Sequence, residues 1–169
     1  MSSALLGEHA PAQAPAKAGP PFNRNLLRSV IEKESINMLG ELISEIKGKI
    51  TGRRVLDLEG PTIETSVSTS GNVTGTTVNE SITFVFRPVS TGVLHGKGQG
   101  VIMAGESEMA TFAAEGLGKI TSSGIRWRGA GFYRTSSTGK LSFLNNIVGV
   151  FESENDNEGN FTEKIWEWK

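Results

Sequence analysis

Two glutamates and one tyrosine are the side chains of this sequence best suited to proton transfer. Glu80 lies just before an apolar run that starts at Ile82, and Glu152 follows one that ends at Val150. Tyr133 is the only tyrosine. A carboxyl group at the mouth of an apolar cavity has a raised pKa and can act as acid or base. The catalytic candidates are therefore Glu80, Glu152 and Tyr133, although such a glutamate more often points outward at a rim.

Other reaction centres lack the residues that they need. The chain has no cysteine, and its two histidines, His9 and His95, are far apart. No carboxylate–histidine spacing is typical of a zinc or iron site. A serine triad would need a histidine and a G-x-S-x-G turn, and the turn is missing. We therefore expect no metal and no cofactor.

The stretch HGKGQG at 95–100 raises the question of a phosphate-binding loop. Its spacing is G-x-G-x-G, whereas a dinucleotide fingerprint reads G-x-G-x-x-G between a strand and a helix. Val101 to Met103 continue instead as strand-forming residues. The stretch is therefore interpreted as a strand with one face bare of side chains.

The elements that must position these residues are β-strands. After Gly40 the hydrophobic period is two, and turn residues separate the segments. No helical segment intervenes, so parallel βαβ units are not expected. We predict an all-β, antiparallel up-and-down β-barrel of about eight or nine strands, because closure removes exposed edges. The predicted strands are 42–50, 53–58, 62–69, 77–87, 93–103, 109–120, 125–135, 144–154 and 161–168.

The first part of the chain differs in composition. Residues 1–24 are rich in alanine and proline and predict a disordered tail. Apolar residues from Leu26 to Ile31 recur at helical spacing, which predicts a short N-terminal helix at about 26–39. The predicted domain is a single barrel over 25–169 that includes this helix.

Hairpin geometry places the glycines on one face of the predicted sheet. Pairing Arg87 with Val93 would set Phe84 opposite Gly96. The next turns would set Gly98 opposite Ala114, Gly116 opposite Gly129, and Gly118 opposite Trp127. Large rings beside glycines suit a narrow, curved barrel interior. The predicted ligand-lining residues are Phe84, Phe86, Phe112, Trp127, Tyr133, Trp166 and Trp168.

Two further faces carry a pattern. The face opposite the glycines holds charged residues, among them His95, Lys97 and Glu115, and we favour an exposed face with cross-strand ion pairs over an anion site. Ile147, Phe151 and Ile165 form a second apolar face. That face requires a cover, either the N-terminal helix or a second subunit.

The net charge and the distribution of apolar residues argue against several classes of partner. The formal net charge is −1 and the pI about 6.2, so no basic field attracts nucleic acid. No stretch approaches the ~20 apolar residues of a membrane helix. The N-terminus has no basic region typical of a signal peptide. We expect a cytoplasmic protein without nucleic-acid or membrane partners.

Four stretches carry a family resemblance: EIKGKITGRRVLDLEGPTIETS, GKGQGVIMAGESEMATFAAEGLGK, IRWRGAGFYRTSSTGKLSFLNNIVGVFE and KIWEWK. They resemble an uncharacterised family of small prokaryotic proteins over about residues 42–169. That family is similar in build to allene oxide cyclase-like and lipocalin-like barrels. The resemblance implies a cup-shaped barrel, often oligomeric in the cyclase-like group, but it implies no activity and supplies no catalytic residue.

Three functions remain open from the sequence. The leading one is a barrel that binds a small apolar or amphipathic molecule, since barrel mouths are common ligand sites. The second is a cofactor-independent isomerase or cyclase that uses Glu80, Glu152 or Tyr133 for proton transfer. The third is a structural protein whose barrel is filled and whose outer face forms a homo-oligomer. We favour binding over catalysis.

Overall fold

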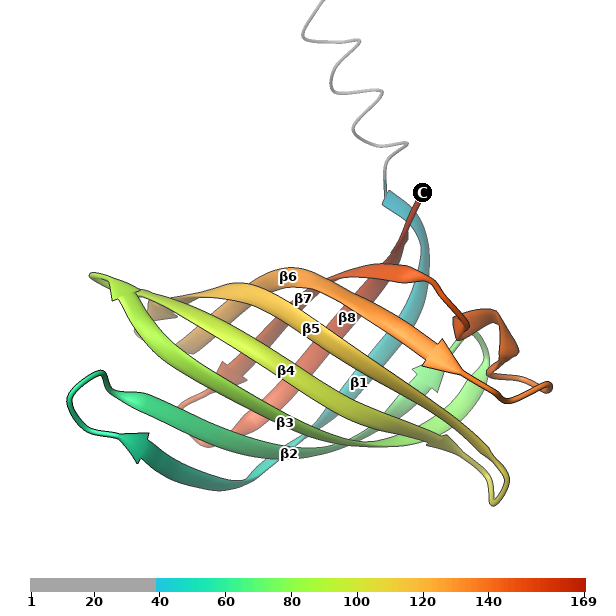
Figure 1. Ribbon diagram of the computed structural model, residues 1–169, viewed down its shortest axis with the longest axis horizontal. Coiled ribbons are helices and arrows are strands. Elements are labelled where there is room, and N and C mark those ends of the chain that lie inside the picture. The colour runs from blue at the N-terminus through green and yellow to red at the C-terminus, as the bar shows by residue number, and fades with distance from the viewer. Residues whose placement is uncertain (1–38) are drawn as a thin grey trace, which may run out of the picture.

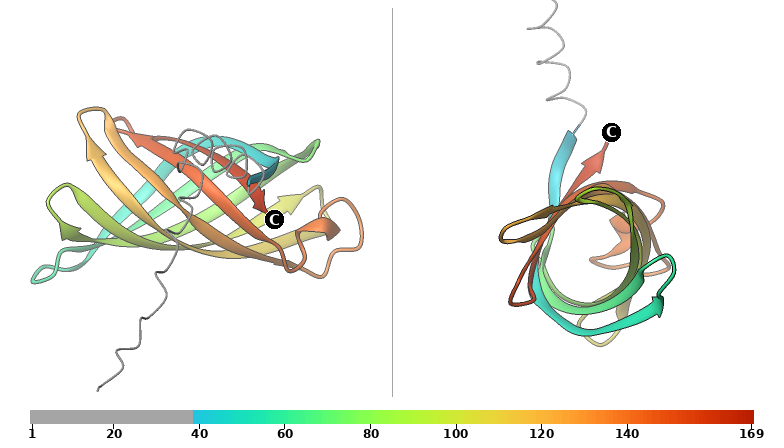
Figure 2. Two further views of the ribbon diagram at one scale, coloured as in Figure 1. Left: turned by 90° about the horizontal axis from the view of Figure 1, so that it is seen from above. Right: turned by 90° about the vertical axis from the view of Figure 1, so that its left-hand side faces the viewer.

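The computed structural model describes residues 39–169, which form a closed barrel of eight antiparallel strands in sequence order (Figure 1). A view along the barrel shows the ring of strands (Figure 2). The all-β up-and-down prediction is confirmed, with eight strands. The predicted tail and nearly all of the predicted helix lie outside the described residues. The strands are β1 (Leu39–Asp57), β2 (Thr62–Val73), β3 (Thr76–Ser90), β4 (Val93–Ala104), β5 (Glu108–Thr121), β6 (Gly124–Thr135), β7 (Val148–Asp156) and β8 (Asn160–Trp168).

Strand β1 is one long element where the sequence predicted two. It spans 19 residues, and its pairing with β2 shifts between Ile50 and Gly52. A β-bulge of this kind adds a residue and bends the strand. The bent strand pairs with β2 along one edge and with β8 along the other, which closes the barrel. The interruption that the sequence shows near residue 52 is therefore a bulge and not a turn.

Strand β2 is longer than predicted. The prediction ended this strand at residue 69, but residues 70–73 continue it, and the hairpin turns at Thr74 and Gly75. Both have positive φ, 45° and 82°. Two consecutive positive φ values belong to a type I′ turn, whose twist matches that of the paired strands. The side chain of Asn72 supports the turn, because its Oδ1 accepts a hydrogen bond from the Gly75 amide at 2.6 Å.

The central strands confirm most of the predicted register. Gly98 lies opposite Ala114, Gly116 opposite Gly129, and Gly118 opposite Trp127. The β3–β4 register differs by two residues, since Phe84 lies opposite Gly98. A shift of two leaves every side chain on its expected face, whereas a shift of one reverses the faces.

Aromatic rings cover most of the inward-facing glycines. A Cβ added to Gly96 would lie 2.8 Å from Trp127, and one added to Gly100 would lie 2.5 Å from Phe112. At Gly129 the ring of Phe151 lies 2.7 Å away. Gly98 differs, because its nearest neighbour would be the Cβ of Phe84 at an ordinary 3.4 Å. Aromatic rings therefore pack directly against these glycines, whereas Gly98 faces open space in the interior.

The faces of β7 and β8 are the reverse of those predicted. Ser153 of β7 lies opposite Trp127, which faces the interior. Phe151 lies two residues before Ser153 and opposite Ile165 of β8, so Phe151 and Ile165 also face the interior. Trp166 lies beside Val150 as predicted, but both lie on the outer wall. The cause is the 12-residue β6–β7 connection, 136–147, which contains a short 3₁₀ helix at Ser142–Leu144. A connection this long does not transmit the alternation of one strand to the next.

The barrel ends are packed with side chains. Leu141 and Leu144, from the β6–β7 connection, are fully buried and close one end. Towards the other end, Trp127 contacts Phe84 and Phe86 edge to face, with ring centroids 5.8 and 5.7 Å away.

Within residues 39–169, no helix is long and apolar enough to cross a membrane.

Candidate functional site

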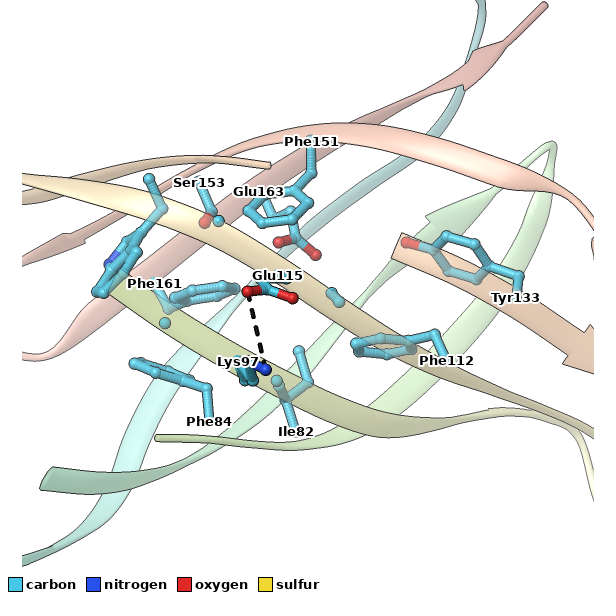
Figure 3. A pocket seen from close by; sticks show the side chains of 15 residues that line it. Ile82, Phe84, Lys97, Phe112, Glu115, Tyr133, Phe151, Ser153, Phe161 and Glu163 are labelled. Atoms are coloured by element: carbon cyan, nitrogen blue, oxygen red, sulfur yellow. Dashed lines mark ion pairs between the residues drawn. The ribbon is translucent and has the colours of Figure 1, made fainter. Parts of the chain in front are cut away.

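An internal cavity of about 60 Å³ lies between these two ends (Figure 3). Its wall is mostly aromatic, and Gly96, Gly98 and Gly116 form its side on β4 and β5. The polar side chains on the wall are few, as is typical of a small-molecule site. The inward side chains that line it are Ile82, Phe84, Phe112, Trp127, Tyr133, Phe151, Ser153, Phe161 and Glu163. Lys97 and Glu115 also border the cavity, but their side chains are 69% and 57% exposed and pair with each other at 3.8 Å.

Glu163 supplies the carboxyl group of the cavity wall. It lies on β8 between Phe161 and Ile165, which are both buried, so alternation turns it inward. Ser153 lies directly opposite on β7. Burial and the nearby charge of Glu80 together raise the pKa of Glu163 to about 8, against a hydrogen bond from Ser153 that lowers it. The carboxyl group is therefore mostly protonated at neutral pH.

Glu80 is a second inward carboxyl group, and only 2% of its surface is exposed. Thr69 Oγ1 donates a long hydrogen bond of 3.5 Å to Oε2, and Oε1 has no partner among residues 39–169. Burial raises the pKa of Glu80 to about 7, against the hydrogen bond from Thr69, which lowers it. A buried polar atom without a partner costs free energy. Glu80 therefore has a free acceptor inside the barrel.

Tyr133 completes the polar interior. It is 4% exposed, and its ring lies 5.5 Å from that of Phe112. Burial raises its pKa well above the usual value, and the charges of Glu163 and Glu80 add to this rise. The hydroxyl therefore stays protonated and serves as a hydrogen-bond donor or acceptor beside two carboxyl groups.

The interior is acidic, with no base to balance it. Every lysine and arginine between residues 39 and 169 is exposed. His95 lies on the outer wall, where its Nε2 is 2.6 Å from Glu115 Oε1. The same stretch contains no cluster of three side chains able to hold a metal ion. Two carboxyl groups thus share an apolar interior without a cationic partner.

The predicted lining residues divide into three groups. Phe84, Phe112, Trp127 and Tyr133 line the cavity. Phe86 shares their face and packs on Trp127, outside the cavity wall. Trp166 and Trp168 were predicted inside, and this is wrong: Trp166 is half-buried on the outer wall and Trp168 is 54% exposed.

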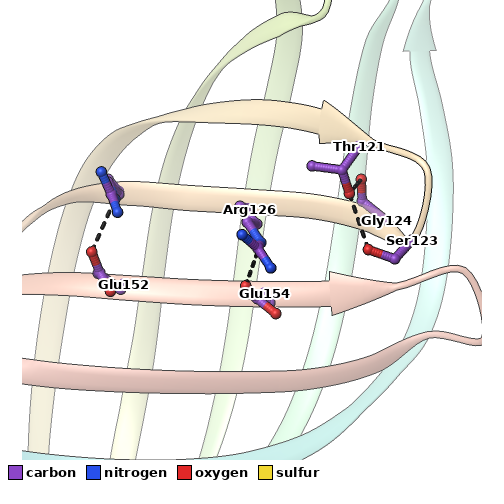
Figure 4. A network of polar contacts seen from close by, with 7 residues as sticks. Thr121, Ser123, Gly124, Arg126, Glu152 and Glu154 are labelled. Atoms are coloured by element: carbon purple, nitrogen blue, oxygen red, sulfur yellow. Dashed lines mark hydrogen bonds and ion pairs between the residues drawn. The ribbon is translucent and has the colours of Figure 1, made fainter.

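The placement predicted for Glu152 is also wrong. It lies on the outer wall of β7, where its Oε1 is 2.9 Å from the Nε of Arg128 (Figure 4). Glu154 forms a similar pair with Arg126 at 2.6 Å. The reversal of β7 explains the error, because Glu152 follows Phe151, which faces inward. Glu152 is therefore part of an exposed cross-strand ion pair, which contributes little to stability.

The predicted lining did not include Ile82, Phe151, Ser153, Phe161 and Glu163, and Glu163 is the ionisable residue among these five. Its signal was present, since Phe161, Glu163 and Ile165 alternate on one face of the last strand. Trp166 and Trp168 dominate the other face by size and led to the opposite assignment. A polar residue flanked by apolar ones at period two was the better guide.

A second hollow lies on the outer wall. It measures about 710 Å³ and is lined by outward residues of β3 to β6, including Ser81, Gln99, Thr111 and Arg134. Arg134 is the only ionisable residue among them. The hollow therefore brings together no group of side chains able to carry out acid–base chemistry.

No protein-family model matches the chain, and no curated protein or solved structure matches it. The fold and the site alone thus define the class: an eight-stranded antiparallel barrel whose aromatic interior holds two carboxyl groups.

Proposed function

We propose that this barrel binds a small apolar or amphipathic molecule in its internal cavity. One observation carries the proposal: the Glu163 carboxyl group and Tyr133 lie on the wall of an otherwise aromatic cavity. The rings would contact the apolar part of the molecule, and these two groups would orient its polar end.

The volume of the cavity limits the size of the ligand. About 60 Å³ holds only a few waters, well below the roughly 300–1,000 Å³ of sites for drug-sized molecules. A larger ligand requires a ring to move. Trp127 is the best placed, because it lies towards one end of the barrel and a single hydrogen bond, Nε1 to Asn155 Oδ1 at 3.1 Å, holds its polar atom.

The finer resemblance to allene oxide cyclase-like and lipocalin-like barrels stays part of this proposal. An eight-stranded closed meander is consistent with the lipocalin-like build. A build alone does not transfer function. The cytoplasmic location, and the absence of nucleic-acid and membrane partners, also stay proposals.

Native mass spectrometry of gently purified protein, repeated after denaturation, tests the binding proposal. We expect a reproducible mass excess that denaturation removes. Trp127 provides a second readout, because it is the one tryptophan on the cavity wall. If the barrel is instead filled, the native protein will show no mass excess. In that case no small compound will change the part of the tryptophan fluorescence that the Trp127→Phe variant lacks.

A proton-transfer enzyme is the second candidate, and Glu80 favours it. The pKa of Glu80, about 7, suits a general acid or base at neutral pH. Tyr133 lies close enough for the charge of Glu80 to raise its pKa. Turnover of a bound compound that Glu80→Gln abolishes without weakening binding would support this candidate.

A homo-oligomer is proposed from an apolar strip on the outer wall. The strip follows neighbouring strands through the pairs Phe132–Val148, Val150–Trp166 and Leu42–Trp166. Phe132 is 62% exposed and Leu42 45%. A contiguous exposed apolar patch marks an interaction site. A second copy of this chain, which presents the same strip, is the occupant that we propose.

A further inference from the structure

We infer that the ligand of the internal cavity is a small organic amine in its ammonium form, held by Glu163 with its hydrocarbon part against the aromatic rings. The inference rests on the proposed binding function and names the class of ligand. Three features lead to it: the carboxyl group on the cavity wall, the lack of a buried cation beside it among residues 39–169, and the aromatic wall.

The interior carboxyl groups have no cationic side chain beside them. Glu163 on β8 and Glu80 on β3 bring two carboxyl groups into one barrel, close enough to affect each other electrostatically. The lysines and arginines of residues 39–169 are all exposed to solvent. Buried carboxylates in proteins are normally paired with cations. A bound cation would therefore supply the partner that the Glu163 carboxylate needs when it loses its proton.

The carboxyl group on the cavity wall favours a hydrogen-bond donor as ligand. Glu163 lies on the wall, whereas Glu80, whose Oε1 is buried without a partner among residues 39–169, lies in the interior outside the wall. A carboxylate accepts hydrogen bonds, and a primary ammonium group offers three donors with no acceptor. An anionic ligand would instead be repelled by the Glu163 carboxylate.

The aromatic wall distinguishes an organic cation from a metal ion. Rings of Phe84, Phe112, Phe151, Phe161 and Trp127 line the cavity. Aromatic faces attract ammonium groups and also cover hydrocarbon. A calcium ion takes six to eight oxygen ligands, and the described residues contain no cluster of three side chains that could begin such a site.

Protons balance this binding step. Burial keeps the pKa of Glu163 at about 8, so below that pH the carboxyl group is protonated. Binding of an ammonium ion then releases the carboxyl proton to solvent, and the net charge of the site is unchanged. The titratable groups that face Glu163 are Glu80 from β3 and Tyr133 from β6, while β1 and β7 present Ile46 and Ser153 beside it. Affinity for an amine should therefore rise about tenfold per pH unit below the pKa of Glu163.

The test compares isobutylamine, isobutanol and isobutyrate, which have similar hydrocarbon parts but differ in charge. Nuclear magnetic resonance titration of the Trp127 indole N–H reports binding, and Trp127→Phe assigns that signal. We expect isobutylamine to bind at least about tenfold more tightly than isobutanol at pH 8, and its advantage to shrink towards pH 6. Isobutyrate should bind most weakly at pH 8.

Variants separate the carboxyl group from the rest of the cavity. Glu163→Gln should abolish the amine preference and keep isobutanol binding, while Glu152→Gln, on the outer wall, should change neither. The pH slope of the unaltered protein gives the same information should Glu163→Gln fail to fold.

Two outcomes are distinguishable failures. Isobutanol or isobutyrate binding as tightly as the amine at pH 8, or magnesium chloride reproducing the same shifts, would overturn the amine class and leave cavity binding intact. No response of Trp127 to any of the three compounds would overturn the binding function as well.

Discussion

At the scale of single residues, burial sets the chemistry of the interior carboxyl groups. The pKa of Glu80 rises to about 7 and that of Glu163 to about 8, from an ordinary 4.5. Each group therefore binds its proton more tightly in the folded barrel than in the unfolded chain. A group with a raised folded pKa stabilises the protonated protein and destabilises it as the pH rises.

Stability should accordingly fall between about pH 5 and pH 8. The unfolded chain loses these protons near pH 4.5 and the folded protein near pH 7 to 8. In that window each group lowers the free energy of unfolding by up to about 1.4 kcal/mol per pH unit. Urea unfolding across this range measures the slope. Glu163→Gln should flatten it, and an unchanged slope would contradict the burial of this carboxyl group.

On the acid side two other carboxylates act in the opposite direction. Hydrogen bonds from the backbone amides of Leu141 and Lys140 lower the pKa of Glu108, and the side chain of Asn160 lowers that of Asp156. Their stabilisation is present above the unfolded pKa and is lost as the pH falls below it. Maximum stability is therefore expected near pH 5.

Substitution by alanine should change the stability of the protein differently at two nearby glycines, Gly96 and Gly98. Gly96→Ala forces a methyl group to within 2.8 Å of Trp127, which overpacks the ring by about 1–3 kcal/mol. Gly98→Ala meets only Phe84, at 3.4 Å, and removes backbone entropy from the unfolded chain, so it should be neutral or stabilise by up to about 1 kcal/mol. Thermal unfolding of the two variants compares them directly. Equal destabilisation would mean that Gly98 does not face the cavity.

At the scale of elements, the register of strands joined by short turns could be predicted from the sequence. The β4–β5 and β5–β6 hairpins have tight connections, so the pairs Gly98–Ala114 and Gly116–Gly129 followed from counting residues. The face of β7 did not, because connection 136–147 breaks the count. Because the face of β7 was assigned wrongly, Trp166 and Trp168 were predicted to face the interior, and Glu163 was not predicted to do so. Alternation within a strand indicates two faces, but only packing against a neighbour decides which one is inside.

The β2–β3 turn offers a test of backbone conformation alone. Gly75 has φ +82° and Gly52 has no positive φ, while an added Cβ meets nothing within 4 Å at either position. Gly75→Ala should therefore cost about 1 kcal/mol through strain at positive φ. Gly52→Ala should change stability much less, because it faces neither strain nor a clash. Chemical denaturation of both variants checks this difference, and equal losses would rule out the type I′ turn.

At the scale of the whole molecule, the barrel separates an apolar strip outside from an acidic cavity inside. If the strip joins two copies, then Phe132→Ser should convert the oligomer to monomer with little loss of fold stability, since Phe132 is largely exposed. Phe143→Ser, in the β6–β7 connection, is the matched control because Phe143 is also exposed but lies off the strip. Sedimentation velocity measures both. A monomer before any substitution would exclude this contact.

The pairing of β1 with β8 also determines how freely the chain order can be rearranged. Leu39 lies opposite Trp168, so the first strand of the barrel begins where the last one ends. A short flexible linker between these positions would make the strand order circular, and the chain could then begin at a hairpin such as Ser122–Ser123 without loss of a strand pair. The eight strands form a ring with no privileged start, and a circularly permuted chain should close around the same cavity.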